Sequence, residues 1–162
     1  MIEKFTSQEQ SSENKEKLLT FEKSGDYVFH GSADILESLE PRQAYNRNEE
    51  TGEMKKDGDP SVFATPYAEV AIFRALTIGQ YVSGKATSEF GINEGLLYFS
   101  SSRNLLERAK SKTGKVYVLK NKDFIDTRGM ECISHKTVLP HEVVEVHFND
   151  LPQNIKIVDV DD

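Results

Sequence analysis

The run Phe29-His30-Gly31-Ser32 combines, within four positions, the residue types that a small-molecule site needs. Residues 27–29 are aromatic or β-branched, which favours an extended strand. Gly31 allows a backbone conformation or a close approach that a side chain would block, and Ser32 can serve as the N-cap of a helix. The pattern predicts a strand that carries a titratable ring into a turn, followed by a short helix over residues 33–39. An ordinary strand-to-helix turn is the alternative interpretation.

A second stretch, residues 61–65, lies about thirty positions further along and has the pattern of a short strand that stops at Pro66. The segment 67–78 that follows is apolar on almost every side, which is typical of a buried helix, so we expect it to be the central helix. Residues 45–60 carry two glycines, a proline and many charges without an apolar period. We predict a long loop there.

The remaining chain predicts one more helix among short strands. Residues 103–110 can form a helix with its charges exposed, whereas residues 79–91 have an irregular pattern. Segments rich in strand-forming residues lie at 96–99, 115–119, 129–133, 143–148 and 154–160. This order favours an α+β fold with a mixed or antiparallel sheet. We expect residues 1–25 to form a polar arm or surface helix and residues 26–162 to form a single α+β domain.

Composition narrows the class of protein. The chain has 162 residues and a formal net charge of -7, with no dense run of lysine or arginine, which argues against a nucleic-acid partner. Cys132 is the single cysteine, so an internal disulfide is excluded. The N-terminus lacks the apolar core of a signal peptide and no apolar run could span a bilayer, so we expect a cytoplasmic protein with no membrane partner. The four histidines lack the spacing of a zinc site, and we predict no metal.

Three motifs together resemble the ADP-ribosyltransferase superfamily and look most like the small rifampin ADP-ribosyltransferases. The first is Phe29-His30-Gly31-Ser32, and the second is Val62-Phe63-Ala64-Thr65 ahead of an alanine-containing helix. The third and loosest is the strand at 115–119, then an acidic stretch, then Ser134 to Pro140 and the strand that ends at 148. The resemblance covers about residues 27–148. It implies an ADP-ribosyltransferase-like fold, in which two small mixed or antiparallel sheets form a cleft with flanking helices.

The resemblance implies that NAD is bound in this cleft as a substrate. His30 would hydrogen-bond the ribose of the nicotinamide half, and Gly31 would present backbone groups to the carboxamide. Phe63 stands where tyrosine is usual; its ring can still stack on nicotinamide, but the phenol is lost. Arg42 is a candidate phosphate ligand, with a surface arginine as the alternative. The predicted NAD-binding set is therefore His30, Gly31, Ser32, Phe63, Thr65 and Arg42.

An acidic residue on the third motif would stabilise the oxocarbenium-like ribose as nicotinamide leaves. Asp126 is nearest in spacing to the strand at 115–119, and Glu131 and Glu142 are the alternatives. We take His30, Asp126 and Glu142 as the candidate catalytic residues.

The predicted function is NAD binding with transfer of ADP-ribose to an unknown acceptor, which the segment 45–60 would help to choose or cover. A catalytically inactive binding or accessory module of the same fold, of a phage or mobile-element type, is the first alternative. An RNA 2′-phosphotransferase is the second, and it would need more basic residues around the phosphates than Arg42, Arg47, Arg74 and His30 supply.

Overall fold

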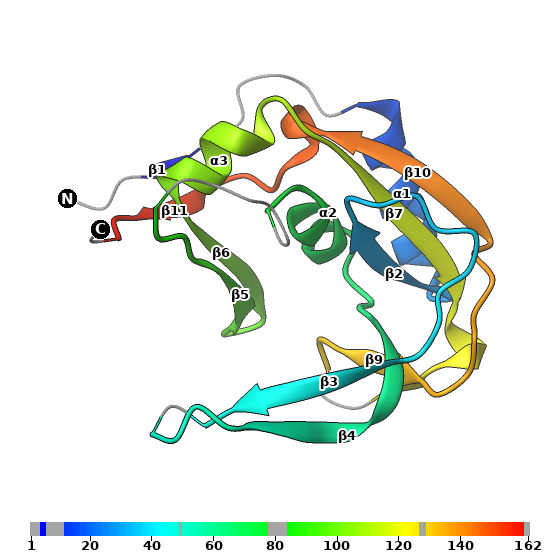
Figure 1. Ribbon diagram of the computed structural model, residues 1–162. Coiled ribbons are helices and arrows are strands. Elements are labelled where there is room, and N and C mark those ends of the chain that lie inside the picture. The colour runs from blue at the N-terminus through cyan, green and yellow to red at the C-terminus, as the bar shows by residue number, and fades with distance from the viewer. Residues whose placement is uncertain (1–3, 6–11, 49, 78–83, 127–128, 161–162) are drawn as a thin grey trace.

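The computed structural model describes residues 4–5, 12–48, 50–77, 84–126 and 129–160 (Figure 1). These residues form an α+β fold of small sheets. The helices are α1 (Glu13–Ser24), α2 (Ala68–Thr77) and α3 (Arg103–Ala109), with single 3-10 turns at Asn121–Asp123 and Phe148–Asp150. The strands are β1 (Lys4–Phe5), β2 (Tyr27–Ser32), β3 (Arg42–Arg47), β4 (Met54–Ala64), β5 (Ser88–Asn93), β6 (Leu96–Ser102), β7 (Thr113–Lys120), β8 (Ile125–Asp126), β9 (Cys132–Ser134), β10 (Glu142–His147) and β11 (Ile155–Val158).

The strands lie in three small groups. The antiparallel sheet β10-β7-β2, called the central sheet below, packs against α2, which lies in the middle of the molecule (Figure 1). A mixed sheet, β1-β11-β6-β5, lies on the side where both chain ends are found. The order β3-β4-β9-β8 makes the third group, from which the β3–β4 hairpin projects.

The central sheet separates two buried clusters, because successive side chains of a strand point to opposite faces. On β7, Val116 and Val118 pack into the cluster around α2, whereas Tyr117 and Leu119 pack into a second cluster on the other face. On β2, His30 follows Val28 by two positions, so its side chain lies on the same face of the sheet as Val28, which belongs to the second cluster.

Close contact between α2 and the central sheet depends on a glycine. A Cβ on Gly31 would lie 2.0 Å from the carbonyl oxygen of Ala71, so only glycine lets the helix backbone approach β2 to this distance. The prediction that Gly31 permits a close approach is correct, and the group that approaches it is α2. The predicted central helix over 67–78 is also confirmed, with bounds Ala68–Thr77.

The predicted helix over residues 33–39 is wrong. This segment is extended and bent, because tertiary partners take the backbone groups that a helix would use. The amide of Leu36 donates to the hydroxyl of Tyr117 at 2.7 Å, and Leu39 exchanges two backbone hydrogen bonds with Val138. The hydroxyl of Ser32 accepts from the amide of Asp34 at 3.0 Å and so closes a local turn instead of capping a helix.

The predicted long loop over residues 45–60 is also wrong, since β3 and β4 form a hairpin there. The turn is built by Asn48, whose side-chain oxygen accepts from the amides of Glu50 and Thr51. Most described side chains of this hairpin are exposed on both faces. The segment therefore does not need the alternation of apolar and polar residues that marks a half-buried strand, which is why its sequence did not indicate strands.

The irregular pattern predicted over residues 79–91 is wrong from Ser88 on, where β5 begins, and residues 79–83 lie outside the described part of the chain. The other predicted elements agree better with the structure. The helix over 103–110 and the strands near 96–99, 115–119, 143–148 and 154–160 are present with shifted ends. A surface helix, α1, occupies much of the predicted N-terminal arm, and its N-cap Ser12 donates from both amide and hydroxyl to buried Asp150. Within residues 12–48, 50–77, 84–126 and 129–160, no helix has the length and apolar character needed to cross a bilayer.

Candidate functional site

The ends of β2 and β4 lie side by side and bring the first two motifs together. Phe29 and Thr65 exchange two backbone hydrogen bonds, of 2.7 and 2.9 Å, although 36 positions separate them. Beside this bridge, the Nδ1 atom of His30 lies 2.7 Å from the carbonyl oxygen of Phe63. The imidazole therefore joins the two strands at one point, and both residues line the same cleft.

The hydrogen bond to Phe63 fixes the state of the His30 ring. A carbonyl oxygen can only accept, so Nδ1 carries the proton and, in the neutral ring, Nε2 is left as an acceptor. Burial lowers the pKa of His30 below its ordinary value; the bond to Phe63 opposes this, and the charges of Arg74 and Arg42 lower the pKa further. At neutral pH the ring is therefore neutral and can accept a hydrogen bond from a ligand hydroxyl.

The cleft has an outer and an inner chamber, which meet at His30 and Phe63. The outer chamber has a volume of about 430 Å³, within the range of small-molecule pockets. Its other lining residues are Ser32, Asp34, Ile35, Leu36, Glu37, Ser38, Leu39, Glu40, Arg42, Ser61 and Val62. It is partly open to solvent and is lined by both polar and apolar groups.

Tyr117 holds one wall of the outer chamber in place. This fully buried residue lies opposite His30 on β7, and its hydroxyl donates to the carbonyl of Asp34 at 2.6 Å while it accepts from the amide of Leu36. The exchange between Leu39 and Val138 fastens the same wall a few residues further on. Residues 33–41 are therefore a positioned wall, even though they contain no helix.

The inner chamber is nearly filled by side chains. It is lined by His30, Gly31, Phe63, Ala64, Thr65, Val70, Arg74, Phe90, Met130 and Glu131. Its free volume of about 20 Å³ holds one water-sized group. A larger group could enter only if one of the lining side chains moved.

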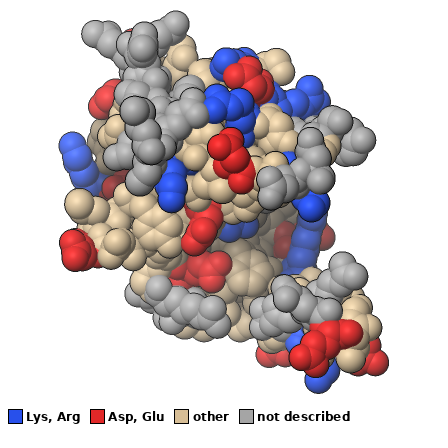
Figure 2. All heavy atoms as spheres, turned by 90° about the vertical axis from the view of Figure 1, so that its left-hand side faces the viewer, with Lys and Arg blue, Asp and Glu red and all other residues tan. Residues whose placement is uncertain are grey.

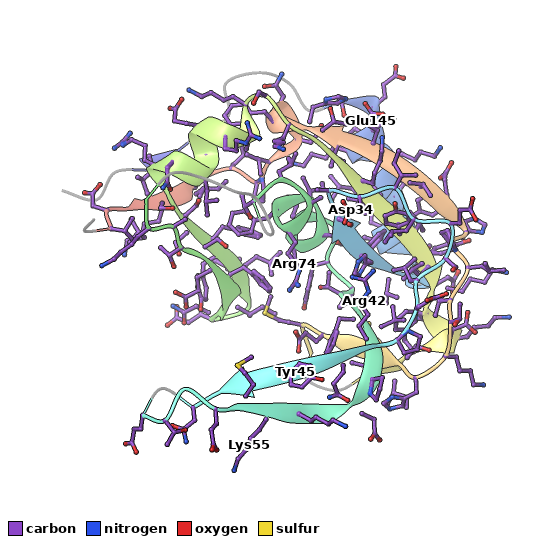
Figure 3. The ribbon with its side chains drawn as sticks, viewed as in Figure 1. Asp34, Arg42, Tyr45, Lys55, Arg74 and Glu145 are labelled. Carbon is purple, nitrogen blue, oxygen red and sulfur yellow. The ribbon has the colours of Figure 1, made fainter. Side chains whose placement is uncertain are left out.

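Arg74 and Glu131 give the inner chamber one charge of each sign. The guanidinium of Arg74 lies over the ring of Phe90, 5.6 Å from the ring centroid, which is a cation–π geometry. Burial lowers the pKa of Arg74, and the nearby carboxylate of Glu131 opposes that shift. Arg74 reaches down from α2 and Arg42 rises from the start of β3, so the two point into the space between α2 and the hairpin (Figure 3).

The predicted NAD-binding residues come together in this cleft. His30 and Phe63 line both chambers, Ser32 and Arg42 line the outer one, and Gly31 and Thr65 line the inner one. The hydroxyl of Ser32 is already engaged by the amide of Asp34, and that of Thr65 accepts from the amide of Tyr67.

The three candidate acids lie in different places. Glu131 lines the inner chamber. Glu142 starts β10 and pairs with Lys17 of α1, away from both chambers. Asp126 ends β8, where its backbone pairs with Cys132, and its side chain lies outside the described part of the structure.

Sequence reasoning did not identify Tyr117 as a positioning residue or Phe90 as a cleft residue, and it named Arg74 only as a basic residue near the phosphates in the RNA 2′-phosphotransferase alternative. Arg74 carried a usable signal, since it is a basic residue within an otherwise apolar helix. Tyr117 did not, because a tyrosine in an apolar strand gives no sign of the segment to which its hydroxyl bonds. Cys132 is buried, as expected of a small apolar residue, and among the described residues no three metal-ligating side chains gather.

The molecule is hollowed on the face that carries the chain ends, above the projecting tip of the β3–β4 hairpin (Figure 2). Acidic and basic side chains alternate around this hollow, and neither sign dominates the face. The chain matches no protein-family model, no curated protein and no solved structure.

Proposed function

We propose that this chain has an ADP-ribosyltransferase-like fold and binds NAD in the cleft between β2 and β4, where it transfers ADP-ribose to an acceptor. The observation that carries the proposal is the junction of His30 and Phe63, which puts a neutral imidazole and an aromatic ring on one cleft. The Nε2 atom of His30 can accept a hydrogen bond from a ribose hydroxyl. The ring of Phe63 can stack on the flat base attached to that ribose. Arg42 in the outer chamber and Arg74 in the inner chamber add positive charge that can pair with a pyrophosphate.

Glu131 is the acid that this proposal assigns to the chemical step. It lines the inner chamber that His30, Gly31 and Phe63 also line, whereas Glu142 is held by Lys17 outside the cleft. When the bond between nicotinamide and ribose C1′ breaks, the electron pair leaves with the nicotinamide and positive charge develops on the ribose. A carboxylate fixed beside that charge stabilises the transition state by several kcal/mol. The acceptor's nucleophile then forms the new bond to C1′ and loses its proton.

A second candidate is a binding module that holds NAD without turnover. The pairing of charge between Glu131 and Arg74 favours it, because a carboxylate that already faces a guanidinium is a weaker stabiliser of a second cation. Phe63 lacks the hydroxyl of the tyrosine that the resemblance expects there, which also favours binding without turnover.

Calorimetric titration with NAD tests the binding step. A matched pair of variants tests the nitrogen of His30 that faces the cleft: His30→Asn keeps a donor for the Phe63 carbonyl but removes that nitrogen, and His147→Asn makes the same change at an exposed histidine that lines neither chamber. We expect wild type and His147→Asn to bind NAD and His30→Asn to bind at least about tenfold more weakly, the effect of one lost hydrogen bond to a ligand. Absence of binding to the wild type, or equal binding by His30→Asn, contradicts the proposal.

Measurement of released nicotinamide tests the chemical step. Glu131→Gln is expected to bind NAD like the wild type but to release nicotinamide about a hundredfold more slowly, whereas Glu142→Gln keeps the wild-type rate. If NAD binds and neither the wild type nor any variant releases nicotinamide, the binding-module candidate replaces the transferase.

A further inference from the structure

A second hollow lies on the far side of the contact between Leu39 and Val138. It has a volume of about 560 Å³ and is lined by Lys120, Lys122, Asp123, Lys136, Thr137, Val138, Leu139, Pro140 and His141. We propose that this basic hollow binds a phosphate-bearing ligand, at a site separate from the NAD cleft.

Charge is the first argument. Three lysines and a histidine face one aspartate here, in a chain whose formal net charge is -7. All three lysines are exposed, and within the described residues none of their ammonium groups forms an ion pair with a carboxylate. The lysines at 17, 110 and 115, by contrast, all have acidic partners. The hollow therefore gathers three lysines that have no carboxylate partner among the described residues.

The walls of the hollow are preformed, which is the second argument. On one side, the 3-10 turn at Asn121–Asp123 is tied to the start of β2, since Asn121 donates to the backbone carbonyls of Asp26 and Gly25. On the other side, the amide of His141 donates to the carbonyl of Val118, and Val138 is bonded to Leu39. A ligand would therefore meet lysine side chains on a fixed backbone and would lose less free energy in ordering the site.

The chemistry of the lining selects the ligand class. A lysine ammonium is a compact, strongly hydrated point charge that binds phosphate oxygens without demanding a planar partner. Several ammonium groups around an open, wet hollow suit a ligand with more than one phosphate. At the rim, Leu139 is 75% exposed and gives apolar surface for a sugar or base. Such a ligand could be a free polyphosphate compound or the backbone of a nucleic acid, and the two share the phosphate group.

The hollow and the cleft lie on either side of one pair of bonded residues. Leu39 lines the outer chamber of the cleft and Val138 lines the hollow, and these two residues are bonded to each other. Binding at the hollow does not depend on the proposed function, because its lining residues and its ligand chemistry are its own.

The test uses the full chain and two probes, inorganic tripolyphosphate and a short single-stranded oligonucleotide, each titrated at low and moderate salt. Lys120→Gln, Lys122→Gln and Lys136→Gln are combined in one variant. A control variant removes three exposed lysines elsewhere: Lys23→Gln, Lys85→Gln and Lys156→Gln. Both variants change net charge by the same amount, so they separate a site from general attraction. Urea denaturation of both variants verifies that they fold as stably as the wild type.

We expect at least one probe to bind the wild type and the control, and to bind the hollow variant at least about tenfold more weakly. Backbone amide signals of residues 120–123 and 136–141 should shift on addition of the bound probe. If the oligonucleotide binds, the slope of the logarithm of its binding constant against the logarithm of salt concentration should be shallower by about two in the hollow variant. This result identifies a nucleic-acid backbone as the ligand. Binding of tripolyphosphate alone identifies a small ligand. The site does not exist if neither probe binds, or if both variants lose affinity equally.

Discussion

The two buried clusters on either side of the sheet β10-β7-β2 are built in different ways. The larger one is organised by α2, whose apolar side chains are almost all buried against Phe29, Val116 and Val118. The smaller one, under the cleft, has no helix. It is assembled from single residues of segments far apart in the chain: Val28, Leu39, Val62, Ala64, Tyr117, Leu119, Cys132 and Val138.

This difference separates stability from recognition. The helix-side cluster is a continuous packed layer, so damage there should lower the free energy of unfolding of the whole molecule. The cleft-side cluster carries the walls of the outer chamber, which are fixed by a few hydrogen bonds to Tyr117, Leu39 and Val138. Damage there should loosen the site more than it unfolds the protein.

Gly31→Ala should have the largest effect, because it forces a methyl group against the backbone of α2 at 2.0 Å from the Ala71 carbonyl oxygen. We expect the free energy of unfolding to fall by about 3 kcal/mol or more, measured by urea denaturation. Gly91→Ala is the control, since its new methyl group meets only the ring of partly exposed Tyr98, which can move. Equal losses in the two variants would show that the helix-side packing is not the tight region.

Tyr117→Phe should have an intermediate effect on stability and should weaken ligand binding more than it weakens the fold. The change removes both hydrogen bonds that hold the wall at Asp34 and Leu36, and we expect a loss of about 1–2 kcal/mol in the free energy of unfolding. NAD affinity should fall by more than this loss of stability explains, because at temperatures where both proteins are folded only the wall differs. Tyr98→Phe, at an exposed site that lines neither chamber, serves as the control. A stable variant with unchanged affinity would remove the positioning role of Tyr117.

The smallest effect is the pH dependence that His30 contributes. Its pKa in the folded protein is below the ordinary value of 6.5, so between those two pH values the unfolded chain binds more protons than the folded one. The free energy of unfolding should therefore decrease as pH falls from about 6.5 through the lowered pKa, and this contribution should be flat above 6.5. His30→Asn should lack that part of the pH profile, measured as the difference from wild type. A difference that grows as pH rises above 7 would contradict the lowered pKa.

Sequence alone predicted the helix-side cluster well. An unbroken apolar pattern over 67–78 identifies a buried helix, and the strands that it packs against are rich in valine and leucine. The cleft-side cluster could not be predicted in the same way. The segment 33–39 has the local pattern of a helix, but its amides bond to Tyr117 and Val138, which lie about 80 to 100 positions away. Local patterns carry no information about such partners.

The candidate site could be predicted only in part, because it too depends on partners that are distant in the sequence. Two short motifs indicated His30 and Phe63, and the bridge between Phe29 and Thr65 does bring them together. The choice among Asp126, Glu131 and Glu142 could not be made from spacing, because it depends on which way β9 and β10 face. Arg74 and Phe90 enter the cleft from α2 and β5, whose positions relative to β2 are set by packing.

Mapping of backbone amide signals during an NAD titration tests most directly whether β2 and β4 together form a ligand site. We expect shifts at residues 30–42, at 61–65 and at 131 at lower NAD concentrations than any shift in the basic hollow, with the signals of α1 unchanged. Shifts confined to the hollow, or no shifts at all at NAD concentrations in the millimolar range, would contradict a nucleotide cleft at His30 and Phe63.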